Sequence, residues 1–230
     1  MPDLSSFYRR SHRYTGAILD FIYPSFCIIC SKRIESSPKF VCQECWTSIP
    51  RLRQPADLDF DDLHIDRFQT IWAFDDTVQK IIHEVKFFGK KSLGKRLGEE
   101  LATVALADSR YARADLIVPV PLHRTKRRER GFNQSAVLSE SVSRALNIPV
   151  VTTALKRIRY TRPQSKLTAV EREKNVRGAF QAGSSNELKK KTVILIDDVL
   201  TTGSTVRACS EVLKKAGVAN VYALTVAATL

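Results

Sequence analysis

The sequence lacks a long hydrophobic run. No stretch of the 230-residue chain approaches the ~20 consecutive apolar residues that a transmembrane helix needs. The start, residues 1–13, is polar and basic, and Asp20 interrupts the apolar stretch after it, so we expect no signal peptide. Internal repeats and long low-complexity segments are also missing. We therefore expect a cytoplasmic protein without a membrane span.

Acidic residues are in short supply. Aspartate and glutamate number 24 against 37 lysines and arginines, which gives a formal net charge of +13. Such an excess favours polyanionic partners, namely phosphates, nucleic acid or a membrane surface, without choosing among them. The remaining composition, 43% hydrophobic and 27% charged, is ordinary for a globular protein. The length allows one sizeable core plus a small appendage.

Cysteines are few, and four of the five lie in two pairs. Cys27 and Cys30 form one C-x-x-C motif, and Cys42 and Cys45 form a second one after eleven residues. Two such motifs can place four thiolates around a tetrahedral Zn²⁺, and a site of four cysteines is structural rather than catalytic. Four unmetallated cysteines or a redox pair are the alternatives. Cys209 lies on the apolar side of a predicted helix, where we expect a core thiol.

A predicted buried strand near the end of the chain runs directly into a polar loop. Residues 193–196, V-I-L-I, are continuously apolar, as in a strand that is buried on both faces. Asp197 and Asp198 follow at its carboxyl end, where open α/β sheets bind their ligands. Ionised carboxylates only accept hydrogen bonds, which suits a vicinal diol such as ribose.

The loop after the two aspartates is rich in hydroxyls and opens a predicted helix. It consists of Thr201, Thr202, Gly203, Ser204 and Thr205. Free backbone N–H groups at a helix start attract phosphate, and glycine lets the backbone fold tightly around an anion. The whole segment predicts a ribose-5-phosphate site. An N-capped helix that follows two surface aspartates is the alternative.

Strand and helix patterns alternate in the rest of the chain. We predict strands at residues 68–74, 115–122, 150–152 and 218–227, and helices at residues 78–88, 92–107 and 137–146. This order argues for a parallel α/β sheet flanked by helices on both faces. Residues 51–66 form a polar, acidic connector. We therefore expect an N-terminal helix and cysteine module in residues 1–55 and an α/β domain in residues 56–230.

The chain resembles the ComF family, in which a zinc-ribbon-like module precedes a type I phosphoribosyltransferase domain. The resemblance rests on the cysteine motifs and on three further stretches. These are D-D-V-L-T-T-G-S-T at residues 197–205, R-x-R-G-F-N-Q at residues 128–134, and T-x-x-Q-x-x-L with R-x-x-N-V-x-G-A-F within residues 161–180. It implies a type I phosphoribosyltransferase fold that binds phosphoribosyl pyrophosphate (PRPP) with Mg²⁺, and a structural Zn²⁺ in the N-terminal module.

The resemblance also implies roles for individual residues. Asp197 and Asp198 would be the catalytic pair that holds the ribose hydroxyls, and residues 201–205 would hold the 5-phosphate. Arg130, with Arg128 as second choice, would bind the pyrophosphate through a guanidinium group. A long loop, residues 156–177, would close over PRPP and exclude water. The further candidates for the pyrophosphate or the loop are Lys86, Gln164 and Arg172.

Three features stay open at this stage. Lys86 either reaches the pyrophosphate or ends a helix in solvent, where the helix dipole favours a cation. His123 either supports the site from behind or lies on the surface. The basic segment at residues 156–177 is either a closing loop or an arm that contacts nucleic-acid phosphates without sequence preference.

Two functions are compatible with these residues. In the first, an enzyme transfers the phosphoribosyl group of PRPP to a nucleophile that the sequence does not identify. In the second, the domain senses PRPP or serves as a scaffold, while the basic surface and the zinc module bind nucleic acid such as single-stranded DNA. The ComF family is associated with DNA uptake, so the resemblance implies competence or DNA-processing proteins as partners in either case.

Overall fold

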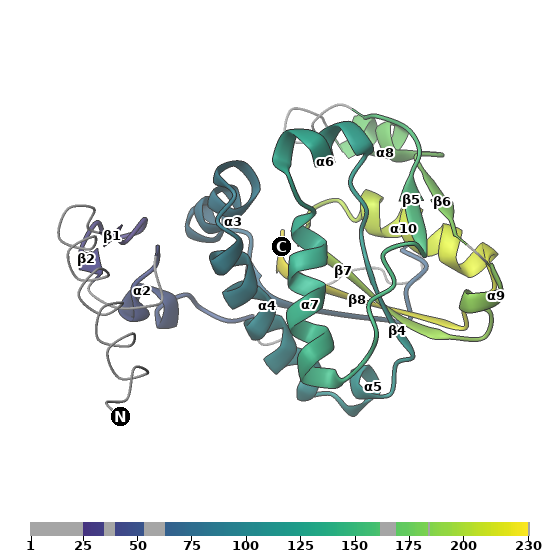
Figure 1. Ribbon diagram of the computed structural model, residues 1–230, viewed down its shortest axis with the longest axis horizontal. Helices are drawn as coiled ribbons and strands as arrows, with labels where there is room; N and C mark the ends of the chain where they lie inside the picture. The colour runs from purple at the N-terminus through teal and green to yellow at the C-terminus, as the bar shows by residue number, and fades with distance from the viewer. Residues whose placement is uncertain (1–24, 35–39, 53–62, 162–168, 184, 230) are drawn as a thin grey trace, which may run out of the picture. The chain divides into compact units, whose positions relative to one another are not determined.

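The computed structural model describes residues 25–34, 40–52, 63–161, 169–183 and 185–229 (Figure 1). The chain divides into two compact units, Met1–Ile49 and Pro50–Leu230. Three expectations lie outside the described residues: the N-terminal helix before Cys27, the domain boundary between residues 55 and 56, and the position of Gln164. Among the helices that the structure describes, none combines the length and the apolar character of a membrane span.

The first unit is a small cysteine module. Strands β1 (Ser25–Phe26) and β2 (Arg33–Ile34) pair antiparallel, and the turn between them carries the first two cysteines. Helix α2 (Gln43–Thr47) begins at Cys42, whose side chain accepts a hydrogen bond from the backbone N–H of Cys45. Few side chains of this unit are buried, and a segment this small needs more than apolar burial to hold its shape.

The second unit is built on a parallel sheet of four strands. They are β3 (Arg67–Ala73), β4 (Leu116–Pro119), β7 (Thr192–Leu200) and β8 (Asn220–Ala228). The spatial order is β3-β8-β7-β4, and every neighbouring pair is parallel. The two central strands are buried along almost their whole length, so both faces of the sheet must be covered. The predicted parallel α/β sheet is confirmed.

Helices cover the two faces of this sheet. The main ones are α3 (Asp76–Phe88), α4 (Lys91–Leu106), α7 (Gln134–Leu146) and α10 (Ser204–Lys215), and shorter ones are α5 (Ser109–Ala112) and α9 (Ser185–Leu188). Helices α4 and α7 lie side by side and both contact the sheet (Figure 1). Helix α10 packs on β7 and β8 and also contacts β6 (Phe180–Ala182) and α8 (Ala169–Val176).

Helix ends follow the local sequence. The Asp75 carboxylate accepts a hydrogen bond from the backbone N–H of Val78 at the start of α3, and Gly89 ends that helix in the left-handed conformation. The Asn133 side chain caps α7 in the same way through Ser135. Aspartate and asparagine are favoured at helix starts, and such caps depend only on neighbours within one turn.

Strand β7 is longer than predicted. The strand expected at residues 193–196 extends from Thr192 to Leu200, so Asp197 and Asp198 lie within it rather than after it. The reason is its central position: β8 continues alongside, with Asp197 opposite Thr225 and Leu200 opposite Ala228. Backbone pairing on one side therefore overrides the weak strand preference of aspartate.

Two further predictions were wrong in detail. The strand expected at residues 150–152 is only an isolated bridge between Val150 and Ile117, and the true strand is β5 (Leu155–Arg157). The expected long loop at residues 156–177 contains the end of β5 and helix α8 (Ala169–Val176). Strand β5 pairs antiparallel with β6 (Phe180–Ala182) as a separate two-stranded ribbon. Apolar side chains in both strands pack against the core, which short polar windows of sequence do not reveal.

The basic run after β4 also differs from expectation. It forms a short helix, α6 (Arg124–Arg130), which is not among the predicted helices. The imidazole of His123 accepts a hydrogen bond from the backbone N–H of Thr125 at its start, and Gly131 ends it in the left-handed conformation. Arginine and lysine are good helix formers, and the two ends supply the caps, so seven residues suffice here.

Candidate functional site

A cleft of about 670 Å³ opens at the carboxyl end of the parallel sheet. Its lining comes from β7, from α3, from the segment after β4 with α6, and from the end of β5. Ligand pockets in proteins typically measure about 300–1,000 Å³, and open α/β sheets bind ligands at this edge. The cleft therefore has the size and place of a small-molecule site.

The two aspartates of β7 lie in the cleft and are buried. The Ser135 hydroxyl donates to Asp197 Oδ1 at 3.0 Å, and the backbone N–H of Asp198 donates to the same oxygen at 2.9 Å. Burial, and next the charge of Asp198, raises the pKa of Asp197 to about 7. This carboxyl group therefore changes its charge near neutral pH, which an exposed aspartate does not do.

Lys86 reaches the second aspartate from α3. Its Nζ atom lies 2.6 Å from Asp198 Oδ2, and the lysine side chain is only 24% exposed. The pair is close, but its geometry is not that of an aligned hydrogen bond, and Asp198 Oδ2 is buried without one. Lys86 thus points into the cleft instead of ending its helix in open solvent, and Asp198 keeps an acceptor oxygen available.

The loop Thr201–Thr205 forms a small hollow where β7 gives way to α10. The hollow measures about 10 Å³ and is lined by residues 199–201 and 203–206. Gly203 has φ 71°, and a Cβ atom there would lie 2.4 Å from Leu63 Cδ2. The Thr202 hydroxyl donates to Ser204 Oγ at 3.1 Å. Backbone N–H groups, hydroxyls and a helix start therefore meet at a spot that favours an anion.

Of the two arginines in the R-x-R-G-F-N-Q motif, Arg130 lines the cleft. It is half-buried, its Nη1 donates to Gln134 Oε1 at 2.5 Å, and its guanidinium lies 5.5 Å from the centre of the Phe87 ring. Arg128 is exposed and is not part of the lining. Arg172 lies in α8, and its side chain is not among those that the structure describes. The structure thus brings Arg130 together with Lys86 and the aspartates, and leaves Arg128 apart.

Further residues at the cleft were not predicted as site residues. Arg157, Tyr160 and Thr161 line the cleft, and Ser135, outside its lining, orients Asp197. The rings of Tyr160 and His123 meet edge to face at 5.4 Å, so His123 lines the cleft as well as capping α6. Thr161 opens the T-x-x-Q-x-x-L motif and Ser135 directly follows the R-x-R-G-F-N-Q motif, whereas neither motif includes Arg157 or Tyr160.

The four paired cysteines of the first unit converge. Their sulfur atoms all lie within 4.8 Å of one another, and Cys30 Sγ is 3.8 Å from Cys42 Sγ. A tetrahedral Zn²⁺ with Zn–S bonds of about 2.3 Å would hold its sulfurs roughly 3.8 Å apart. The donor set and its spacing therefore fit a structural Zn²⁺.

The pKa values of Cys27 and Cys45 are shifted in opposite directions. Burial opposes ionisation of Cys27, but hydrogen bonds from the backbone N–H groups of Cys30, Cys42 and Ile29 outweigh it and lower its pKa to about 6. Burial and the neighbouring sulfurs raise the pKa of Cys45 to about 12. The surroundings thus favour the thiolate form of Cys27 and oppose that of Cys45.

Two family models match the chain, in the order that the structure shows. A double zinc ribbon domain matches residues 18–56, and a phosphoribosyl transferase domain matches residues 133–229. The solved structure of the allosteric regulatory enzyme of purine biosynthesis aligns with 62% of this chain and 29% of its own length, at 23% identity and a TM-score of 0.42.

Curated relatives cover most of the chain. Competence protein F of Haemophilus influenzae is 32% identical over 198 residues, which are 84% of this chain and 85% of that protein. DNA utilization protein YhgH of Escherichia coli K12 is 29% identical over 89% of this chain and 90% of its own. Competence protein ComFC of Bacillus subtilis is 24% identical over 83% and 72%, respectively. The parallel sheet, the four-cysteine cluster and these matches together show that the chain belongs to the ComF family, with a zinc ribbon followed by a phosphoribosyltransferase domain.

Proposed function

We propose that the protein binds PRPP in the cleft and transfers its phosphoribosyl group to an acceptor, within the cytoplasm. One observation carries the proposal: the buried pair Asp197 and Asp198 lies directly before the small hollow of hydroxyls and backbone N–H groups at the start of α10. A diol acceptor and a phosphate cradle on one continuous segment match the two ends of a ribose 5-phosphate.

The donor would occupy the cleft from the hollow toward α3. The carboxylates of Asp197 and Asp198 would accept hydrogen bonds from the ribose hydroxyls, and the N–H groups of Thr201–Thr205 would hold the 5-phosphate. Arg130 and Lys86 are the cations placed to hold the pyrophosphate. Arg128, Gln164 and Arg172 remain candidates for contacts with the pyrophosphate or within the loop over it.

In the reaction, the bond from ribose C1 to the pyrophosphate oxygen breaks, and its electron pair leaves with the pyrophosphate. A lone pair of the acceptor forms the new bond to C1, and the acceptor releases a proton to water. Cations aimed at the departing oxygens stabilise the charge that develops there.

Mg²⁺ is implied by the phosphoribosyltransferase fold, and the residues fit it. Asp198 Oδ2 is buried without an aligned hydrogen bond and offers the hard oxygen ligand that this ion prefers. When bound with PRPP, Mg²⁺ would supply Lewis-acid stabilisation of the pyrophosphate.

The test is release of pyrophosphate from PRPP in the presence of Mg²⁺ and a panel of nitrogen nucleophiles. We expect acceptor-dependent release by the wild-type protein and a loss of about 10²–10³-fold in Asp198→Asn. Asp66→Asn is the matched control, because Asp66 pairs with Lys214 outside the cleft. PRPP that binds without any turnover in the whole panel would contradict transfer and leave only a PRPP sensor.

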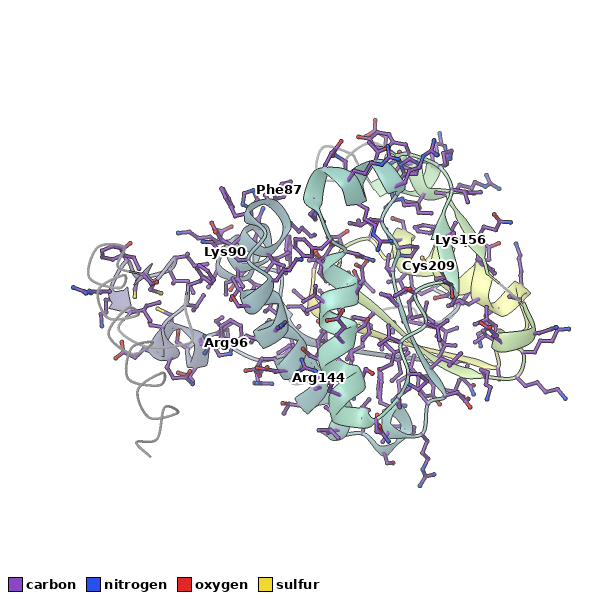
Figure 2. All side chains as sticks on the ribbon, in the orientation of Figure 1. Phe87, Lys90, Arg96, Arg144, Lys156 and Cys209 are labelled. Carbon is purple, nitrogen blue, oxygen red and sulfur yellow. The ribbon has the colours of Figure 1, made fainter. Side chains whose placement is uncertain are left out.

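A second function has its own support, namely binding of single-stranded DNA. Helix α6 is rich in exposed arginine, and Phe87 lies beside it (Figure 2). Phe87 and the next residue, Phe88, are 65% and 63% exposed. Basic grooves with aromatic side chains suit single strands, because any base can stack on them. The relatives are named competence protein and DNA utilization protein, and these names agree with DNA as a partner. They agree equally with other competence or DNA-processing proteins as partners.

Salt dependence tests this second function. Binding of an oligothymidine to the wild-type protein should weaken steeply with salt, and Arg127→Gln with Arg128→Gln should reduce the slope by about one unit for each lost phosphate contact. Phe88→Ala should weaken binding without changing that slope. A slope that neither arginine affects would exclude α6 as the contact.

A further inference from the structure

Arg157 is a half-buried cation that the roles proposed above do not use. It lies at the end of β5, in the two-stranded ribbon that is separate from the parallel sheet, and it lines the cleft. Its Nη2 donates to the hydroxyl of Thr161, and its guanidinium lies 5.2 Å from the centre of the Phe180 ring. These two contacts fix the plane of the guanidinium while leaving donors free.

In the described part of the chain, Arg157 makes no direct ion pair, and the carboxylate that acts on its charge is Asp197, which also lines the cleft. Its Nε atom is buried without any hydrogen-bond partner. The two lysines of the cleft do form ion pairs: Lys86 pairs with Asp198, and Lys126 pairs with Glu129. A buried charge without a partner is costly unless something else supplies the opposite charge. Arg157 is therefore placed like a ligand-binding group rather than a structural one.

The surroundings of Arg157 indicate what kind of ligand would fit. A guanidinium with open N–H donors binds carboxylate or phosphate oxygens in pairs. Tyr160, three residues further on, is 47% exposed and meets the ring of His123 at the cleft wall. An aromatic surface next to an anion site suits a planar molecule that carries an acidic group.

The ligand of Arg157 would differ from the donor. Each charged or diol group of PRPP already has a candidate partner on the sheet edge, on α3 or on α6. Arg157 approaches from the ribbon, on a different element. We propose, on the basis of the PRPP site proposed above, that Arg157 binds a carboxylate or phosphate group of the phosphoribosyl acceptor, so that acidic planar acceptors are selected over neutral ones.

Matched pairs of probes test this selection on the full-length protein. Calorimetry would measure binding of nicotinate against nicotinamide, orotate against uracil, and phenyl phosphate against phenol, each with PRPP and Mg²⁺ present. We expect the acidic member of at least one pair to bind the wild-type protein more tightly. A preference in the first two pairs would identify a carboxylate, and one in the third pair a phosphate.

Three variants separate the role of Arg157 from general effects. Arg157→Gln should raise the dissociation constant of the acidic probe by about 10- to 100-fold and leave that of the neutral probe unchanged. Arg157→Lys keeps the charge but not the paired donors, should show a smaller loss, and replaces the first variant if that one fails to fold. Lys156→Gln removes a charge from the exposed neighbouring position on β5 and should change nothing (Figure 2).

The donor provides the deciding comparison. The dissociation constant of PRPP for Arg157→Gln should stay within about threefold of the wild-type value. A lost charged hydrogen bond to PRPP would raise it by more than that. Three results would overturn the acceptor role and leave the PRPP site of the wild-type protein standing. They are a large loss of PRPP affinity in Arg157→Gln, acidic probes that bind Arg157→Gln as well as they bind wild type, and no binding of any acidic probe to the wild type. Failure of PRPP to bind the wild-type protein would overturn the proposed function, and the acceptor assignment with it.

Discussion

Asp197 and Asp198 occupy consecutive positions of a buried strand, where two full negative charges are difficult to hold. Lys86 faces Asp198, whereas Asp197 receives only neutral donors, the Ser135 hydroxyl and a backbone N–H. Burial, and next the charge of Asp198, raises the pKa of Asp197 to about 7. The two carboxyl groups are thus adjacent in sequence but differ in chemistry.

The raised pKa of Asp197 predicts a specific dependence of stability on pH. Between the ordinary value of 3.8 and about 7, the folded protein holds the proton more tightly than the unfolded chain. The contribution of this group to the free energy of unfolding therefore falls as the pH rises through that window and levels off above it. We expect the stability of Asp197→Asn relative to wild type to increase from about pH 5 to pH 7, measured by urea denaturation.

Asp115→Asn is the control for this titration. Hydrogen bonds from the Thr192 N–H and from Lys191 lower the pKa of Asp115, so its stabilising contribution is lost only when the pH falls below the ordinary value of 3.8. Its stability relative to wild type should stay constant over the same pH range. Parallel pH profiles for the two variants would contradict the protonation assigned to Asp197.

At the scale of elements, the junction of β7 and α10 depends on one close approach. Gly203 is left-handed and lies over Leu63, so the loop can turn tightly before the helix begins. Gly89, at the end of α3, has nearly the same φ of 66°, but a Cβ atom there would meet nothing within 4 Å. A substitution at Gly89 would therefore cause backbone strain alone, whereas one at Gly203 would cause backbone strain and steric overlap.

We expect the two alanine substitutions to differ in cost. Gly89→Ala should destabilise the protein by about 1 kcal/mol, the cost of a left-handed alanine. Gly203→Ala should add the overlap with Leu63, roughly 1–3 kcal/mol more, and weaken PRPP binding because the hollow changes shape. Denaturation and calorimetry measure the two effects. Equal losses of stability in the two variants would show that the Leu63 contact does not constrain the loop.

At the scale of the whole molecule, the two units are stabilised by different means. The second unit buries a continuous apolar core around β7 and β8, whereas the first buries few side chains and gathers four sulfur atoms. A bound Zn²⁺ would supply the first unit with the stability that its small core lacks. Loss of the metal should therefore affect one unit and spare the other.

Cysteine substitutions test this division. Cys27→Ser should lower the zinc content from about one ion per chain to near zero and remove hydrogen-exchange protection from residues 25–49, with little change in the second unit. Cys209→Ala should do the reverse: it keeps the zinc but destabilises the second unit by about 0.5–3 kcal/mol, because Cys209 is buried in its core. No zinc in either the wild type or Cys27→Ser would contradict the metal site.

Much of the fold could be predicted because its signals are local. The C-x-x-C pairs, the caps at Asp75 and Asn133, and the polar loop before α10 each involve residues within a few positions of one another. The order of elements was sufficient to indicate a parallel α/β sheet, and motif resemblance indicated the family. Polar or basic stretches were less informative: residues 124–130 became a helix, and residues 156–177 contained a strand end and α8.

The sequence by itself determined which residue types are candidates for the chemistry: four thiol ligands, a carboxylate pair and a hydroxyl-rich loop at a helix start. Tertiary structure alone decided their partners. It brought Lys86 to Asp198, Ser135 to Asp197, and Arg157 into the cleft from a ribbon outside the main sheet. The physical reason is distance along the chain, because spacing records neighbours within a turn or a strand, whereas these contacts depend on how β3, β8, β7 and β4 are ordered and covered.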